Sequence, residues 1–97
     1  MPTSLVLSPA AREDLLAIWQ YGVLHWGKPR SDRYLDELKE AIWSLLEHPE
    51  KGRTRREFLG EIRSLPVSSH VIFYRFQENR MEIIRILHVR QDVNRHL

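Results

Sequence analysis

The apolar residues of this chain change their spacing about halfway along it, and that change limits the folds available. Between residues 9 and 46 they recur every three or four positions, as in amphipathic helices, and between residues 61 and 89 they alternate, as in strands. We therefore expect a short strand at Leu5–Leu7 and two helices, followed by three strands. The first helix is expected at 9–26, and the second is expected from Asp32 through Leu46, ending before Pro49. The strands are expected at 61–67, 70–76 and 81–89.

Local signals support the helical half. Ser8 followed by Pro9 is typical of a helix start, because serine caps the first amides and proline tolerates the first helical position. Gly27 and Pro29 indicate the end of that helix, and the second begins after a short linker. The sequence predicts a helical hairpin.

At 97 residues the chain has room for one domain, residues 1–97, with one helical layer on one sheet. The expected class is α+β, with a short strand and a helical hairpin packed on a curved antiparallel sheet in the order β-α-α-β-β-β. The chain has no cysteine, no signal-peptide pattern at its start and no apolar run of about 18 residues. We expect a cytoplasmic protein that does not enter a membrane.

The last two predicted strands are apolar in both alternating phases. Both phases carry aliphatic or aromatic residues: Ile83, Ile84, Ile86 and Leu87 in one strand, and Val71, Ile72, Phe73 and Tyr74 in the other. A sheet with helices on one side and water on the other should instead alternate apolar with polar residues. Two explanations remain open, namely a partner that covers the second face and a strongly curved sheet that wraps its own core.

Charge is distributed unevenly. Residues 1–50 hold five Lys or Arg against eight Asp or Glu, and residues 51–97 hold ten against five, so the second half carries a net charge of +5. This asymmetry, with a basic loop at Lys51–Arg56, favours an anionic partner. The second helix is rich in carboxylates, which argues against a helix-turn-helix DNA reader, and the basic loop lacks the interleaved aromatics of a nucleic-acid site.

Catalytic motifs are mostly absent. The sequence has no glycine-rich phosphate loop, no G-x-S-x-G elbow and no H-E-x-x-H pair, so we assign no catalytic residue and expect neither a metal nor a cofactor. One polar group stands out at the end of the last strand. His88 lies within four residues of Arg85, Arg90 and Asp92, and such a set can orient a phosphate or a proton.

Four stretches together resemble the ParE branch of the RelE/ParE toxin superfamily. They are "LSPAAREDL", "WQYGVLHWG", "HPEKGRTRREFLGEIRSLPVSSHVIFYRF" and "IIRILHVRQD", which cover most of the chain. The resemblance implies a small toxin with a helical hairpin against a curved sheet. It also implies a ParD-type antitoxin whose C-terminal segment wraps the toxin, and we expect Phe73, Ile83 and Leu87 to contact that segment.

The expected activity depends on which branch of the RelE/ParE superfamily the chain resembles. ParE-like members inhibit DNA gyrase, whereas RelE-like members cut messenger RNA on the ribosome with an acid, a base and several cations, usually including lysine and a tyrosine or histidine near the last strand. Here no tyrosine follows Tyr74 and no lysine follows Lys51. Gyrase inhibition is therefore the favoured reading, with a ribonuclease or a non-toxic antitoxin-binding relic as alternatives.

The polar end of the last strand is the expected target-binding surface. Its candidate residues are Arg85, His88, Arg90 and Asp92. A rigid strand can hold such donors in one geometry, whereas the basic loop would supply mainly long-range attraction. No sequence-specific DNA binding by this chain is expected.

Overall fold

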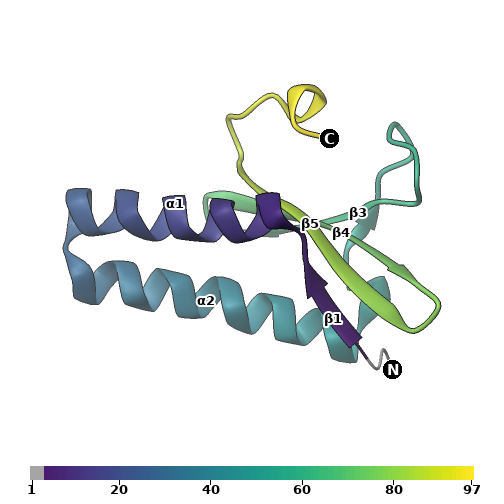
Figure 1. Ribbon diagram of the computed structural model, residues 1–97, viewed down its shortest axis with the longest axis horizontal. Coiled ribbons are helices and arrows are strands. Elements are labelled where there is room, and N and C mark those ends of the chain that lie inside the picture. The colour runs from purple at the N-terminus through teal and green to yellow at the C-terminus, as the bar shows by residue number, and fades with distance from the viewer. Residues whose placement is uncertain (1–3) are drawn as a thin grey trace.

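The computed structural model describes residues 4–97, so residues 1–3 of the expected domain lie outside the described residues. The order of the main elements confirms the α+β class (Figure 1). The chain forms β1 (Ser4–Leu7), α1 (Pro9–Trp26), α2 (Lys28–Glu47), β2 (Arg53–Thr54), β3 (Arg63–Val67), β4 (His70–Gln77) and β5 (Arg80–His88), with single 3-10 turns η1 (Pro49–Lys51) and η2 (Val93–Arg95).

The sheet has five strands in the order β1-β5-β4-β3-β2 and is mixed. Strands β2 to β5 pair antiparallel, as expected, but β1 pairs parallel with β5. The parallel pair is possible because α1 and α2 form the long crossover between the two edges of the sheet. The two-residue strand β2 lies within the stretch expected to be a loop.

Helix α2 begins four residues before the range that its carboxylates and apolar stripe suggested. Pro29 occupies the first turn of α2 and so starts this helix, while Gly27, at φ 91°, makes the sharp turn between the helices. The expected start of α1 is confirmed, since Ser8 Oγ accepts a hydrogen bond from Ala11 N–H at 3.0 Å. The helices approach closely at Gly22, where a Cβ would clash with Ser31 Oγ.

A β-bulge explains why β5 is apolar in both phases. Tyr74 lies opposite Ile83 and Phe73 lies opposite Arg85, so Ile84 is an extra residue on β5. The strand therefore changes phase at this point, and Ile83 and Ile86 both join the core beside the helices. A strict alternation, as read from the sequence, wrongly places these two residues on opposite faces.

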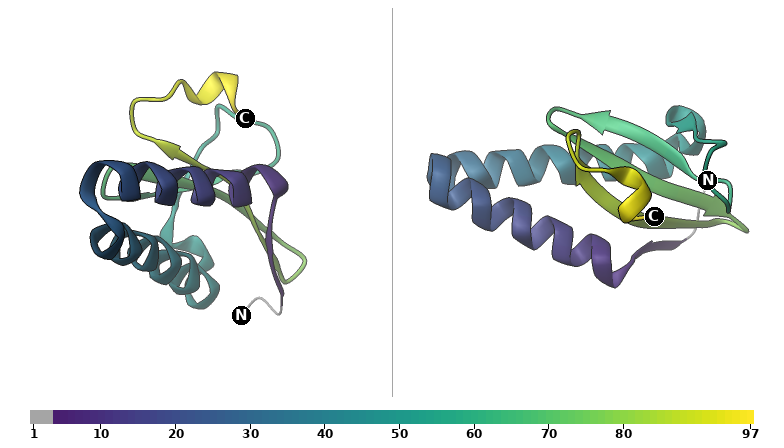
Figure 2. Two further views of the ribbon diagram at one scale, coloured as in Figure 1. Left: turned by 60° about the vertical axis from the view of Figure 1, so that its left-hand side comes forward. Right: turned by 90° about the horizontal axis from the view of Figure 1, so that it is seen from above.

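The second face of the sheet carries a small core of its own. Ile62, Phe73 and Leu87 are buried there, with Phe58 from the loop before β3 and Val93 from the C-terminal segment packed against them. Figures 1 and 2 show the helices on one side of the sheet and the C-terminal segment on the other. The chain thus covers part of the face for which a partner was expected.

The buried stripe of α2 is testable at Leu38, which is 0% exposed. Replacing Leu38 by Ala should lower the free energy of unfolding by about 2–5 kcal/mol, because the neighbouring side chains cannot fully close the cavity. Leu24→Ala on α1 is the matched control, since Leu24 is 84% exposed and its loss should change stability by less than about 0.5 kcal/mol. Urea unfolding measures both, and similar losses would contradict the packing described here.

Candidate functional site

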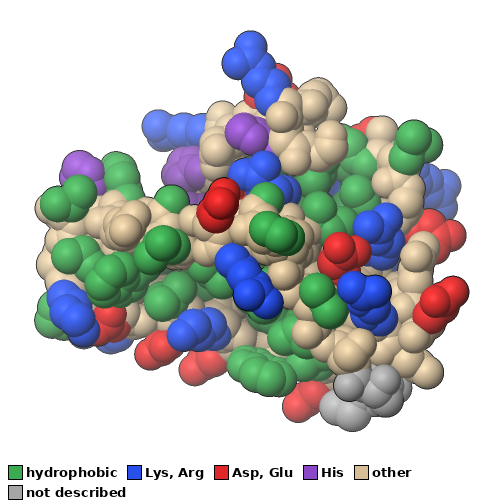
Figure 3. Space-filling view, in the orientation of Figure 1, with side chains coloured by type: hydrophobic (Ala, Val, Ile, Leu, Met, Phe, Trp, Pro, Cys, Tyr) green, Lys and Arg blue, Asp and Glu red, His purple; other side chains and the backbone are tan. Residues whose placement is uncertain are grey.

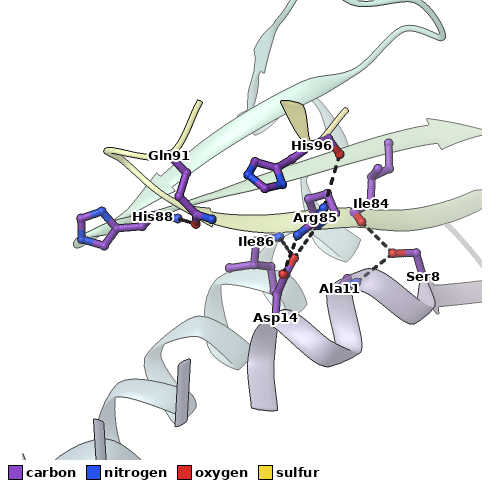
Figure 4. Close-up of polar contacts among 9 residues, drawn as sticks. All are labelled: Ser8, Ala11, Asp14, Ile84, Arg85, Ile86, His88, Gln91 and His96. Carbon is purple, nitrogen blue, oxygen red and sulfur yellow. Dashed lines mark hydrogen bonds and ion pairs between the residues drawn. The ribbon is translucent and has the colours of Figure 1, made fainter. Parts of the chain in front are cut away.

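Arg85, the cation in the middle of β5, is held by Asp14 of α1. Its Nε lies 2.8 Å from Asp14 Oδ2 and its Nη2 lies 2.9 Å from Oδ1, a two-pronged ion pair (Figure 4). Asp14 Oδ2 also accepts a hydrogen bond at 2.9 Å from Ile86 N–H, next to the bulge. The hydrogen bonds that Arg85 donates to the Asp14 carboxylate are the main cause that raises the pKa of Arg85. The guanidinium is therefore largely occupied within the fold.

His88 organises the turn that follows β5. Its backbone N–H donates to Gln91 Oε1 at 2.7 Å, and its ring Nδ1 accepts from Arg90 N–H at 3.1 Å (Figure 4 shows the contact with Gln91). The second bond orients the ring and leaves Nδ1 occupied. His88 is therefore partly a structural residue.

Arg90 and Asp92 are the exposed members of the predicted set. Asp92 Oδ1 accepts from Asn94 N–H at 3.0 Å and so caps η2, whereas Arg90 directs no side-chain ion pair toward any described carboxylate. Arg85 and His88 are only partly exposed, and they contact different elements. Sequence reasoning grouped the four, but the structure does not bring their side chains to one point.

The residues predicted to contact an antitoxin are buried. Ile83 is 0% exposed in the core beside the helices, because the bulge keeps it on the helical side. Phe73 and Leu87 are each 1% exposed beneath Phe58 and Val93. None of the three side chains lies on the surface of the chain alone, and their contact with an antitoxin stays a prediction.

The basic loop also contributes contacts that stabilise the fold. Arg55 donates from Nε to Glu57 Oε2 at 3.0 Å and from Nη1 to Ser64 Oγ at 3.2 Å, and its guanidinium lies over the rings of Phe58 and Phe73. It holds the loop over the second face of the sheet. Arg53 and Arg56 remain exposed and available for long-range attraction.

Sequence reasoning missed a polar cluster that joins α2, β4 and β5. Tyr34 Oη lies 2.6 Å from His70 Nδ1, and the ring centres of His70 and His88 are 5.2 Å apart. Burial raises the pKa of Tyr34, so its hydroxyl stays protonated. This hydroxyl accepts a hydrogen bond from Ser69 N–H at 3.2 Å, and the direction of its bond with His70 is set by the His70 tautomer. The sequence feature that could have revealed this cluster is the pairing of His70 with His88 on neighbouring strands. The short turn at 78–79 predicts that pairing only if the extra residue of the bulge is counted.

The described part of the chain shows neither a metal site nor a membrane span. Among residues 4–97, no three His, Cys, Asp or Glu side chains gather to hold a metal ion. Within the same residues, no helix has both the length and the apolar character needed to cross a membrane.

The chain is a small two-layer α+β domain, and comparison of its sequence with known families gives its class. Residues 5–93 match the family described as the ParE toxin of the type II toxin–antitoxin system parDE. Toxin ParE1 of Mycobacterium tuberculosis is 38% identical over the full length of both chains, and Toxin ParE1 of Caulobacter vibrioides is 37% identical over 94% of each. The chain belongs to the ParE toxin family.

Solved structures share the fold at lower identity. A structure of the chromosomal ParDE system from P. aeruginosa superposes with a TM-score of 0.78 at 23% identity, over 89% of this chain and 95% of that one. The RelBE2 toxin–antitoxin complex of Mycobacterium tuberculosis gives 0.69 at 21% identity, over 91% and 99%. These likenesses show that the chain shares its fold with both structures.

The Asp14–Arg85 pair should contribute to stability, since the two side chains are only 14% and 20% exposed. Asp14→Ala should lower the free energy of unfolding by about 1.5–3 kcal/mol, because Arg85 and the Ile86 amide lose their acceptor. The Lys28–Asp32 pair has the same 2.8 Å separation but is 68% and 43% exposed, so Lys28→Ala should change stability by less than about 1 kcal/mol. Equal effects in chemical unfolding would show that burial of the pair is unimportant.

Stability should also fall in mild acid because of His70. Burial is the main cause that lowers its pKa below the usual value near 6.5, and His88 lowers it further while Asp14 opposes the shift. The unfolded chain then binds a proton at higher pH than the folded one, so stability is full above about 6.5 and declines as the pH falls toward the folded-state pKa.

Replacing His70 by Gln should flatten this decline. Glutamine cannot titrate but can still form a hydrogen bond with the Tyr34 hydroxyl, and thermal unfolding between about pH 7.5 and 5 measures the difference. His25→Gln, at an exposed histidine near the end of α1, is the control and should keep the decline. An unchanged decline in His70→Gln would assign the pH dependence to another group.

Proposed function

We propose that this chain inhibits DNA gyrase in the cytoplasm and is neutralised by a ParD-like antitoxin. The observation that carries the proposal is the family match over residues 5–93, supported by 38% identity to a Toxin ParE1 along the whole chain. The P. aeruginosa likeness comes from a ParDE system, which supports an antitoxin of the ParD kind.

The arrangement at the end of β5 favours gyrase inhibition over RNA cleavage. Transesterification of RNA requires a free base, an acid and unpaired cations around one phosphate. Arg85 is paired with Asp14, and His88 Nδ1 is occupied by Arg90 N–H. The fold shared with RelBE2 keeps ribosome-dependent RNA cleavage as the alternative to be tested beside it.

Arg90 is the side chain that we expect to contact gyrase. It is exposed and follows a rigid strand, with its backbone fixed by His88. Arg90→Glu should raise the concentration needed to inhibit supercoiling by about tenfold or more, since it reverses a charge at a specific contact. Purified gyrase with relaxed plasmid measures this directly.

Arg56→Glu is the matched control, because Arg56 is also an exposed arginine but lies on the basic loop. Its reversal should weaken inhibition only slightly and mainly at low salt. Arg55 is unsuitable, since its reversal would disturb the contacts with Glu57 and Phe73. A folded Arg90→Glu protein that inhibits gyrase normally would remove the end of β5 from the mechanism, and ribosome-dependent cleavage by the unaltered protein without gyrase inhibition would favour the RelE-like activity.

A further inference from the structure

The segment between α2 and β2 is anchored in the core by one tyrosine. Tyr74 Oη of β4 donates a hydrogen bond to the carbonyl oxygen of Pro49 at 2.7 Å and accepts one from Gly52 N–H at 2.8 Å. Tyr74 is 0% exposed, and a Cβ at Gly52 would clash with its hydroxyl. Residues 49–52 are therefore held in one conformation against the sheet.

Arg63 of β3 is fixed by this anchored segment rather than by a carboxylate. Its Nη1 donates to the carbonyl oxygens of Gly52 at 2.9 Å and of Glu50 at 3.3 Å. Among residues 4–97, no carboxylate forms an ion pair with Arg63, or with Arg56 of the loop before β3. The Arg63 guanidinium is thus held in place without an acidic partner, as a preorganised anion site requires.

A hollow of about 490 Å³ lies beside these two arginines. Thr54 of β2, which pairs directly with Arg63 across the two strands, also lines it. Its aromatic lining consists of Phe58 from the loop and Phe76 from β4. The volume is within the range of small-molecule sites, about 300–1,000 Å³. The hollow therefore combines fixed cationic donors with aromatic surface.

The lining has only a small excess of positive charge. Arg55 lines the hollow as well, so three arginines face two glutamates, Glu50 and Glu61. Figure 3 shows cationic and anionic side chains interspersed at the end of the molecule that carries the loop before β3. One phosphate group matches this balance, whereas further phosphates would be repelled by the two carboxylates.

The loop that supplies Phe58 and Glu61 has an uncommon backbone conformation. It is closed by a hydrogen bond from Arg55 N–H to the carbonyl oxygen of Ile62 at 2.8 Å. Just before this closure, Glu61 has a φ of 55°, which places it in the left-handed region. A residue other than glycine rarely adopts this conformation, and such residues are concentrated at functional and ligand-binding sites.

We propose that this hollow binds a nucleoside phosphate. Arg63, Arg56 and the Thr54 hydroxyl hold the phosphate, and the base lies against the rings of Phe58 and Phe76. An aromatic base explains the two phenyl rings, which an inorganic anion would leave unused. The basic loop alone lacks aromatic residues, so the site becomes visible only when the fold brings Phe76 of β4 beside it.

A free mononucleotide and a nucleotide within a single strand offer the same chemistry to this site. The two glutamates can accept hydrogen bonds from sugar hydroxyls or from an amino group on the base in either case. The inference is independent of gyrase inhibition, because the hollow is lined by none of the residues at the end of β5.

The test titrates the full-length protein with adenosine 5′-monophosphate, and isothermal titration calorimetry gives the dissociation constant. Arg63→Gln should raise this constant about tenfold or more, because the phosphate loses its charged donor. Arg53→Gln is the matched control, since Arg53 is an exposed arginine beside Thr54 that does not line the hollow. It should raise the constant by less than about threefold. Equal losses in the two variants would show general charge attraction and would overturn the proposal.

Two further variants separate binding from folding, and thermal unfolding checks each of them. Arg63→Lys keeps a cationic donor for the carbonyl oxygens but loses the forked geometry, so it should unfold near the temperature of the unaltered protein and bind more weakly. Arg56→Gln removes an exposed side chain without an ion pair and should also weaken binding. Unchanged affinity in folded Arg63→Gln and Arg56→Gln proteins would overturn the proposal.

Partial ligands test the chemistry of the site. Inorganic phosphate and adenosine should each bind at least about tenfold more weakly than the monophosphate, because each engages only one part of the lining. Adenosine triphosphate should bind no more tightly than the monophosphate. Inorganic phosphate that bound as tightly as the monophosphate would exclude the base from the site and overturn the assignment.

A short single-stranded oligodeoxyadenylate distinguishes the two sources of the nucleotide. Displacement of the monophosphate by this strand, with the same loss in Arg63→Gln, would identify a nucleic-acid strand as the source and support the site. Binding of the monophosphate that the strand does not displace would support the site and identify a free nucleotide. Absence of binding by both probes would reject the site and leave the proposed function unaffected.

Discussion

The ion pair between Asp14 and Arg85 is the interaction on which the arrangement of this molecule depends. It joins α1 to β5, the strand that lies between β1 and β4 in the sheet, and it does so at the bulge. Arg85 Nη1 also approaches the carbonyl oxygen of His96 at 3.4 Å, so the pair reaches the C-terminal segment. Helix, sheet and tail therefore share one anchoring point.

The bulge beside that anchor determines how the two faces of the sheet are used. It allows β5 to send Ile83 and Ile86 to the helical core while Leu87 packs with Phe73 on the other side. Phe58 and Val93 then cover this second face from the loop and the tail. A domain of this size gains from two small cores, because either one alone buries little apolar surface.

Most of the fold could be predicted from the sequence, because the helical and alternating periods are local properties. The helix start at Ser8 and the order of elements follow from such signals. The parallel pairing of β1 with β5 and the bulge at Ile84 depend on contacts between distant segments, and so they were missed. For the same reason the site was predicted poorly. The sequence does not show that Arg85 is paired, because its partner Asp14 lies 71 positions away in the chain.

The hydrogen bond from Arg90 N–H to His88 Nδ1 ties the exposed end of β5 to the interior of the fold. The ring centre of His88 lies 5.2 Å from that of His70, and His70 Nδ1 lies 2.6 Å from Tyr34 Oη of α2. The backbone of the residue expected to meet gyrase is therefore joined to the second helix through two imidazole rings. A substitution at Tyr34, although it is far from Arg90 in the sequence, would thus alter the shape of the exposed end of β5.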